Sequence, residues 1–443
     1  MMLIVYIFYE IYWKRRRLPP GPTPWLLAGN IPHFLCYQSI DDMFLAWKQK
    51  YGGVNGVVQI DGDKWREQRR FSLHVLRDFG LGRALMEQKI QCEVTHFVEF
   101  IEQQHLKHQQ IDICQATAVC VGNIINNILF GHRFAQKPIN YLQGSEEFHK
   151  LHSLLDEQSR LVINPMMGAY IVAPILTRIP FLNKKWKHLL RIRQQLWSYL
   201  DVNIEVQFHY HFIMKMLLLD LFFAGMETTV TTMKWGFLMV LIHPEVQTKI
   251  QEELDECDDE IIKLSDRNRC PYTMATLNEI QRIANILPIN LLRTVAEDKL
   301  MDDGYFYPAG TLCIPQISIA MNDPENFTNP QTFCPERFLE NDGETLKRYD
   351  AFMPFSIGKR QCLGESLARA ELFLIFANAL HNFRFRSAVV PSNSASSNSS
   401  SSTQTSSSNS QQPSTKRLLG LTVSPPSYKC VVERRQRRSS HKH

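Results

Sequence analysis

A ten-residue segment, Phe355 to Gly364, contains the residue types that can hold a metal cofactor through sulfur. Cys362 lies in it between Gly358 and Gly364, two residues after Arg360, and the following segment has the pattern of a helix. A thiolate ligand pushes electron density onto a haem iron and favours O–O cleavage. Glycines allow close approach to a flat macrocycle, and a guanidinium binds carboxylates through a planar fork. We therefore interpret Cys362 as a candidate haem ligand and Arg360 as a candidate partner of a haem propionate.

A single cysteine is more often a buried structural residue than a ligand. The fixed features of this segment, which follow the pattern F-x-x-G-x-R-x-C-x-G, favour the ligand interpretation. With this segment the chain resembles the cytochrome P450 family, in which the same loop carries the cysteine that ligates the iron. The resemblance implies haem b as cofactor and Cys362 as its metal ligand, with Phe355, Gly358, Arg360 and Gly364 in the haem-binding loop.

A second motif, A-G-M-E-T-T at 224–229, lies within an apolar segment from Phe212 to Leu241. Hydrophobic residues occur on all sides of this predicted helix, so we expect it to be buried. A buried acid beside a hydroxyl is costly unless the pair has partners or a task. One interpretation is a glycine-relieved helix crossing with a satisfied threonine. The resemblance implies instead a kink beside the iron, where Thr228, with Glu227 behind it, relays protons for oxygen activation.

Glu279 and Arg282 form an E-x-x-R motif, and residues three apart on a helix can pair. Such pairs are common on surfaces, where they contribute about 0.5 kcal/mol. In the cytochrome P450 family the pair is buried and completed by an arginine from a P-E-R-F segment, which is present here at 335–338. The resemblance therefore implies a structural triad of Glu279, Arg282 and Arg337 behind the haem.

Further basic residues are candidate propionate partners. Trp65 and Arg69 match a W-x-x-x-R helix and lie one turn apart, and the resemblance implies that both donate to haem propionates. Arg293 stands where microsomal relatives have another basic partner. Arg66 and Arg70 would form a solvated basic face, which could meet an acidic redox partner.

Composition limits the other classes of function. The chain has 443 residues, 44% of them hydrophobic, and this is ample for one large core or two closely packed subdomains. The net charge of +5 lies largely in two short basic runs, so a nucleic-acid-binding face is not indicated. Ten cysteines occur without C-x-x-C pairs, which predicts neither a zinc site nor a disulfide framework. We expect reduced thiols in a body that faces the cytosol.

The ends of the chain carry segments outside the predicted body. Residues 1–17, an apolar run followed by a basic cluster, are interpreted as a short membrane anchor. The apolar run spans roughly 20 Å as a helix against the roughly 30 Å of a bilayer core, so an interfacial anchor, a remnant of a longer span and a buried helix stay open. Residues 18–25 form a proline-rich, stiff hinge. Residues 435–443 form a basic tail.

Residues 26–434 are predicted to form the haem domain, which is mainly α with a small β region. Short strands are expected around a turn between Leu300 and Ile319. Residues 392–415 are a Ser-rich insertion, expected to be disordered because it cannot bury enough apolar surface, and to interrupt a terminal hairpin. Set against the family, the chain also has apparent deletions before Trp65 and, between Asn203 and Met214, before the central oxygen-activating helix.

The resemblance implies a microsomal, animal-type haem-thiolate monooxygenase. It would insert one oxygen atom from O2 into an apolar steroid, lipid or xenobiotic, with electrons from NADPH through NADPH-cytochrome P450 reductase. The location implied is the cytosolic face of the endoplasmic reticulum membrane, and an arthropod steroid-hormone hydroxylase is one specific hypothesis. One alternative is a truncated, catalytically impaired haem-binding isoform or an incomplete gene model. Another is isomerisation or dehydration at the same haem, which ranks lower because those relatives tend to lose the acid–threonine pair.

Overall fold

A computed structural model describes the greater part of the chain. The described residues are 66–67, 69–74, 84–107, 110–134, 146–162, 164, 166–167, 176, 179–203, 211–257, 260–288, 290, 293–301, 304–388 and 413–436. Several predictions lie outside them: the anchor, the hinge, Trp65, the deletion before Trp65, residues 204–210 of the second deletion, and most of the Ser-rich insertion and basic tail.

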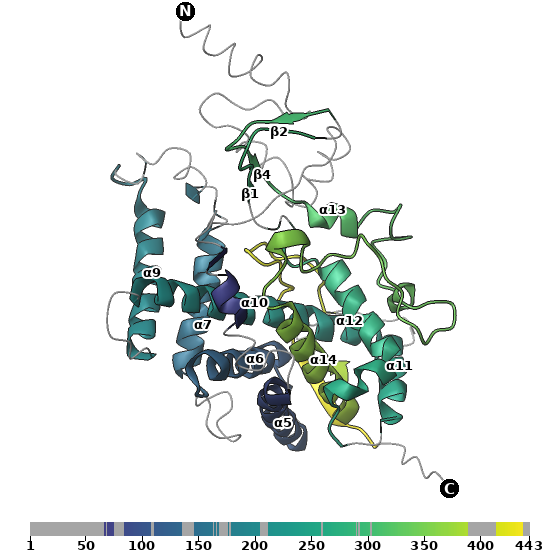
Figure 1. Ribbon diagram of the computed structural model, residues 1–443. Coiled ribbons are helices and arrows are strands. Elements are labelled where there is room, and N and C mark those ends of the chain that lie inside the picture. Colours follow the sequence, from purple (N-terminus) through teal and green to yellow (C-terminus); the bar gives the residue numbers. More distant parts are fainter. Residues whose placement is uncertain are drawn as a thin grey trace, which may run out of the picture.

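Helices dominate the described part of the chain, as the sequence predicts (Figure 1). A short helical segment at 66–67 and 69–74 comes first. The longer helices are α5 (Ala84–Leu106), α6 (Ile113–Phe130), α7 (Glu146–Val162), α9 (Lys184–Asn203), α10 (His211–Ile242), α11 (Pro244–Asp255), α12 (Pro271–Ala284) and α14 (Glu365–Asn382), and α13 (Ile317–Met321) is a single short helical turn. Short 3-10 turns are η4 (Leu264–Arg269), η5 (Pro335–Phe338) and η6 (Gly358–Arg360).

The β structure consists of three small antiparallel pairs. Strand β1 (Arg293–Thr294) pairs with β4 (Leu312–Cys313), and β2 (Lys299–Leu300) pairs with β3 (Phe306–Tyr307). Strand β5 (Phe383–Ser387) pairs with β6 (Cys430–Arg434), with Phe385 opposite Val432. The Ser-rich segment therefore lies in sequence between two paired strands. The prediction of a mainly α fold with a small β region is confirmed.

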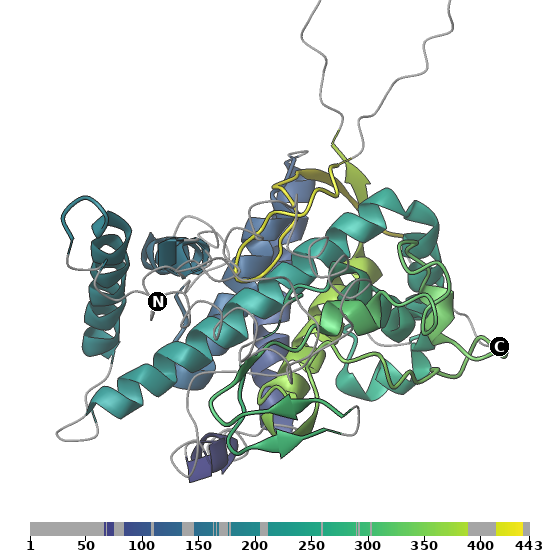
Figure 2. The same cartoon turned by 90° about the horizontal axis from the view of Figure 1, so that it is seen from above.

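Helix α10 is the centre of the core. It crosses the molecule from the side of α7 and α9 to the side of α11 and α12 (Figure 2) and packs most extensively against α6. Its predicted extent, Phe212 to Leu241, is correct to within one residue at each end, and the helix continues without interruption through the predicted kink at 224–229. Hydrophobic residues on every side of the helix explain why its second half is almost completely buried.

Two features of the packing set the position of the helices around α10. Gly122 of α6 lies against the ring of Phe148 of α7, and a Cβ at that position would collide with the ring. The carboxylate of Glu253 in α11 accepts hydrogen bonds from Tyr272 N at 2.6 Å and Thr273 N at 2.8 Å, which satisfies the exposed N–H groups at the start of α12. The ends of α11 and α12 are thus fixed to each other.

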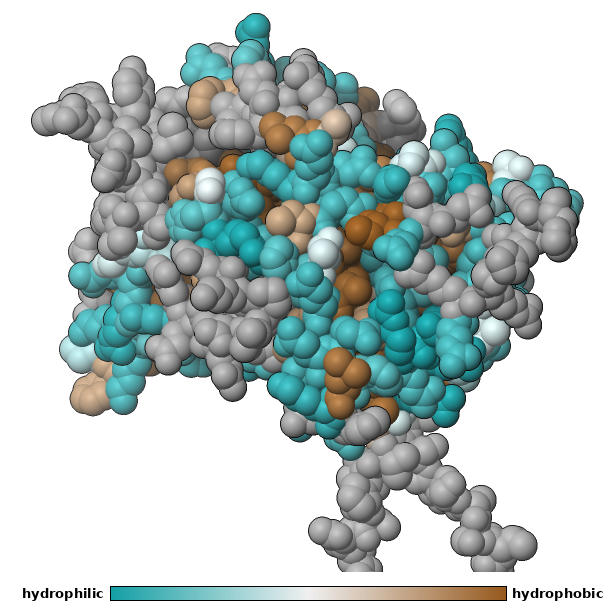
Figure 3. Space-filling view, turned by 90° about the horizontal axis from the view of Figure 1, so that it is seen from below, coloured by the Kyte–Doolittle hydropathy of each residue, from teal (hydrophilic) through white to brown (hydrophobic). Residues whose placement is uncertain are grey.

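One helix in the described part of the chain, α6, is long and apolar enough to cross a membrane, but most of it is buried inside the protein, as expected of a core helix. On the face opposite the β1–β4 end, hydrophilic residues predominate and hydrophobic residues form small separate groups (Figure 3). Small groups of this kind are normal on a protein surface, and among the described residues of this face they do not form an extended apolar patch.

Candidate active site

The cysteine loop, residues 355–364, folds back on itself just before α14. Cys362 N donates to Phe355 O at 2.9 Å, and Gln361 N donates to Gly358 O at 3.0 Å. The turn requires left-handed backbone at Gly358, with φ of 77°, where glycine carries no steric penalty. Because α14 begins at Glu365, the sulfur of Cys362 lies close to the positive end of that helix.

Cys362 lines a cavity of about 360 Å³ between the cysteine loop, α10 and α6. Loss of hydration raises the pKa of the thiol, while the backbone N–H of Gly364 acts in the opposite direction. The free cysteine is therefore a neutral thiol at pH 7. Metal coordination would remove its proton, because a coordinating thiol is deprotonated outright.

The cavity walls are mainly apolar, with a few polar groups on facing elements. Helix α6 contributes Ile125, Ile128 and Leu129, and α14 contributes Leu367, Ala368 and Leu372. Polar side chains enter from α10 at Thr228, Thr229 and Thr232. A flat apolar group with one charged edge suits these surroundings, since small-molecule sites combine apolar walls with a few placed polar groups.

Two arginines line one edge of the cavity, and a third, Arg293, is not a lining residue but is close enough for its pKa to respond to Arg360. Of the two lining residues, Arg69 and Arg360, Arg69 donates from Nη2 to Gln361 O at 2.9 Å, which ties the helical residues 69–74 to the cysteine loop. Nε of Arg293 is buried without a hydrogen-bond partner. The pKa of Arg293 is lowered mainly by burial and to a smaller extent by the positive charge of Arg360. Such a cluster calls for an anion, and the carboxylates of a haem fit it.

The predicted acid–threonine pair is divided between two sides of α10. Thr228 lines the cavity, and its Oγ1 donates to Ala224 O at 2.6 Å. Glu227 is 6% exposed, is not among the cavity-lining residues, and accepts hydrogen bonds from Thr422 Oγ1 at 2.8 Å and Thr231 Oγ1 at 3.4 Å. The structure therefore places Thr228 at the cavity and Glu227 behind it, held by the C-terminal segment.

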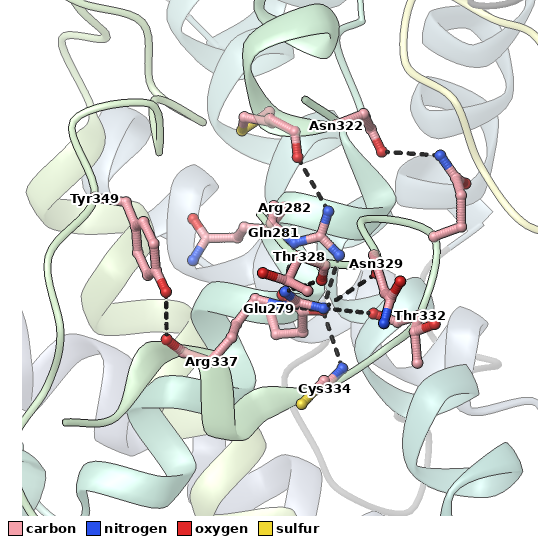
Figure 4. Close-up of polar contacts among 12 residues, drawn as sticks. Glu279, Gln281, Arg282, Asn322, Thr328, Asn329, Thr332, Cys334, Arg337 and Tyr349 are labelled. Atoms are coloured by element: carbon pink, nitrogen blue, oxygen red, sulfur yellow. Dashed lines mark hydrogen bonds and ion pairs between the residues drawn. The ribbon is translucent and has the colours of Figure 1, made fainter. Parts of the chain in front are cut away.

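The three residues of the predicted triad contact one another through Glu279, as Figure 4 shows. Glu279 accepts from Arg282 Nε at 2.7 Å and from Arg337 Nε at 3.1 Å, and both Glu279 and Arg282 are fully buried. Arg337 also donates to the carbonyl oxygens of Thr328, Asn329 and Thr332. Because none of the three lines the cavity, they organise the chain and do not contact a bound molecule there.

Glu371 of α14 is a residue of the cavity that the sequence motifs did not reveal. It is 1% exposed, and burial raises the pKa of its carboxyl to about 8. Its Oε2 accepts from Thr229 Oγ1 at 3.2 Å, while Oε1 has no hydrogen-bond partner. Glu371 is thus a neutral acid at pH 7. The one signal in the sequence is an acid just before the apolar run L-F-L-I-F.

Comparisons with known proteins match this chain over most of its length. A family model described as Cytochrome P450 matches residues 38–211 and 211–408. The chain is 37% identical to cytochrome P450 2B2 of Rattus norvegicus, with 86% of this chain and 90% of the rat protein covered. It is 35% identical to cytochrome P450 2J2 of Homo sapiens, with 85% and 75% covered, and 31% identical to cytochrome P450 2A5 of Mus musculus, with 94% of each covered.

The buried triad predicts a large loss of stability when its acid is removed. We expect Glu279→Gln to lower the free energy of unfolding by about 3–5 kcal/mol, because two largely buried arginines lose their counter-charge. The matched control is Glu336→Gln, which affects a half-exposed ion pair with Lys249 and should cost at most about 1 kcal/mol. Denaturant unfolding measures both, and equal stabilities of the two variants would contradict the structural role.

The buried acid predicts a pH dependence of stability. Between about pH 5 and 8 the folded protein keeps a proton on Glu371 that the unfolded chain has lost, so the free energy of unfolding falls as pH rises. The slope from this group approaches about 1.4 kcal/mol per pH unit. Glu371→Gln should flatten the profile by this amount, whereas Glu252→Gln on the exposed side of α11 should not. Parallel profiles for wild type and Glu371→Gln would show that the acid is ionised in the fold.

Proposed function

This chain belongs to the cytochrome P450 family and is a haem-binding monooxygenase, and we propose that its substrate is an apolar steroid, lipid or xenobiotic. We propose further that its electrons come from NADPH through NADPH-cytochrome P450 reductase, at the cytosolic face of the endoplasmic reticulum membrane. The observation that carries the proposal is the shared cavity of Cys362 and Thr228, which contains a sulfur ligand on one side and a hydroxyl on the other.

The residues of the cavity fit a haem in type and position. Cys362 would ligate the iron, and Arg69, Arg293 and Arg360 would hold the propionates, with Trp65 as a further donor. When bound, haem supplies an iron centre at which O2 is activated, so that one oxygen atom enters the substrate and the other leaves as water. Thr228 would exchange its hydrogen bond to Ala224 O for one that passes a proton into the cavity.

Glu227 would supply the proton that Thr228 passes on, from the side of α10 that faces away from the cavity. Its carboxyl group accepts hydrogen bonds from Thr422 and Thr231, and Glu227 is the residue directly before Thr228 in α10. A positioned acid commonly takes part in proton transfer in catalysis, and the hydroxyls within hydrogen-bonding distance of Glu227 are those of Thr231 and Thr422. The apolar walls from α6 and α14 favour an apolar substrate, because burial of apolar surface is the main term available for binding there.

The first experiment is the absorption spectrum of the purified protein, reduced with dithionite and bound to carbon monoxide. We expect a strongly red-shifted Soret band, because a thiolate donates electron density to the iron. Cys362→Ala should lose the shifted band. Protein that incorporates no haem, or a band without the shift, would support the alternative of an impaired isoform and contradict the proposed site.

The proposed reductase would approach the cysteine loop from the side of the helical segment 66–74. Arg70 of that segment and Lys359 of the loop are exposed, and Arg69 of the same segment contacts the loop directly. A basic surface beside the cysteine loop would attract an acidic partner and bring the source of electrons close to the haem.

A charge reversal tests this approach. Arg70→Glu should lower the rate of reduction by the reductase severalfold at low ionic strength, and the difference from wild type should shrink as salt screens the charges. Arg191→Glu on the exposed side of α9 is the matched control, since it makes the same charge change on a helix that contributes no residue to the cysteine loop or to the cavity. Equal rates for the two variants at low salt would place the docking surface elsewhere.

A further inference from the structure

Two cysteines lie side by side at the junction between α11 and α12, outside the active-site cavity. Cys257 follows the end of α11, and Cys270 is the residue directly before α12. Their sulfur atoms are 3.8 Å apart, and the two residues are 6% and 0% exposed. Neither residue lines the cavity, and the motifs of the active site do not include them.

The surrounding contacts fix the backbone on both sides of the cysteine pair. Glu253 binds the first N–H groups of α12, so the two helix ends cannot drift apart. Arg269 Nη2 donates to Glu256 O at 2.7 Å, which closes the junction directly beside the two cysteines. Cys257 N donates to Leu254 O at 3.2 Å, and Cys270 N donates to Arg267 O at 3.3 Å. The backbone on both sides of the cysteine pair is therefore fixed by the fold, which keeps the two side chains next to each other.

The two sulfur atoms are within hydrogen-bonding distance, and either one can be the donor. This contact lowers the pKa of Cys257 and raises the pKa of Cys270. Cys257 is therefore the thiol that ionises first, and the thiolate is the reactive form towards oxidants. Cys257 is also the more exposed residue of the two, at 6% against 0% for Cys270.

We propose that Cys257 and Cys270 form an oxidisable dithiol, a modification site at which a peroxide produces an intramolecular disulfide. The Cys257 thiolate attacks the O–O bond of hydrogen peroxide and becomes a sulfenic acid, with hydroxide as the leaving group. The sulfur of Cys270 then attacks the sulfur of Cys257, and water leaves as the S–S bond forms. Two thiols and one peroxide thus give one disulfide and two water molecules, and the two electrons pass from sulfur to oxygen.

The change in geometry is small. An S–S bond measures about 2.05 Å, so the sulfur atoms must approach by roughly 1.8 Å from their separation of 3.8 Å. Intracellular disulfides outside hyperthermophiles are usually transient and redox-sensing. The dithiol is accordingly the resting form, and a thiol reductant restores it by exchange. The disulfide closes the loop that contains η4 and fastens α11 to α12.

Peptide mapping of the haem-loaded protein tests the proposal. After treatment with limiting hydrogen peroxide and alkylation of remaining thiols, trypsin cleaves at Lys263 and Arg269, between the two cysteines. The reduced protein yields separate peptides 250–263 and 270–282. The disulfide form yields the two joined as one species, lighter by two hydrogens than their sum, and dithiothreitol should release them.

Variants separate this site from general oxidation. Cys270→Ser should abolish the joined species and leave the sulfenic acid of Cys257 open to capture by dimedone. Cys92→Ser, which removes an exposed cysteine on α5, should leave the joined species unchanged. The proposal is wrong if peroxide oxidises Cys92 in the wild-type protein while peptides 250–263 and 270–282 remain separate, or if Cys257 is found joined to a different cysteine. The Soret band recorded in parallel reports the haem site separately, so a failure there is distinguishable from a failure of the dithiol.

Discussion

The buried charge of Glu279 is the interaction on which the cysteine loop depends. Between α13 and the cysteine loop the chain runs through a long, largely irregular stretch, in which the short turn η5 and an isolated bridge between Leu339 and Leu346 are the regular features. Arg337 orders it by binding Glu279 and three carbonyl oxygens of that stretch. Tyr349, whose hydroxyl donates to Arg337 O, packs on Phe327 with ring centroids 4.8 Å apart. A single carboxylate on a rigid helix thus fixes the irregular segment that leads to Cys362.

The charged residues around the cavity are concentrated at one edge, and the walls that would face the flat sides of a haem are mainly apolar. Arginines from separate segments lie near one edge, where the charge of Arg360 contributes to the lowered pKa of Arg293. On α14 the buried Glu371 stays neutral, whereas Glu365 at the start of the same helix contributes to the raised pKa of Cys362. Glu227 lies behind α10 with two threonine hydroxyls. This arrangement favours an anionic edge on the bound group and keeps its apolar faces free of charge.

The sequence predicted the features that depend on local spacing. The cysteine loop, the extent of α10, and the pairing of Glu279 with Arg282 all follow from residues close together in the chain, and the structure confirms the last two. Sequence analysis could not predict contacts between distant segments, such as the hydrogen bond between Thr422 and Glu227. Glu371 was missed because its pKa comes from burial, which a motif does not encode. The cysteine pair was missed for a similar reason, since a spacing of 13 residues matches no known ligand or redox pattern.

Helix α12 connects the cysteine pair with the Glu279 triad, because the pair lies beside its first residue and the triad at its middle. Its first residues are fixed to α11 through Glu253 and lie beside the cysteine pair, while its middle carries Glu279 and Arg282. Arg282 also donates to Met321 O at 3.0 Å, so the middle is restrained independently of the N-terminal junction. A covalent bond formed at Cys270 therefore restrains a part of the helix that is already fixed and leaves the triad unchanged. It follows that oxidation there should slow the opening of the α11–α12 junction with little effect on the cavity, because the triad isolates the cysteine loop from events at the start of α12.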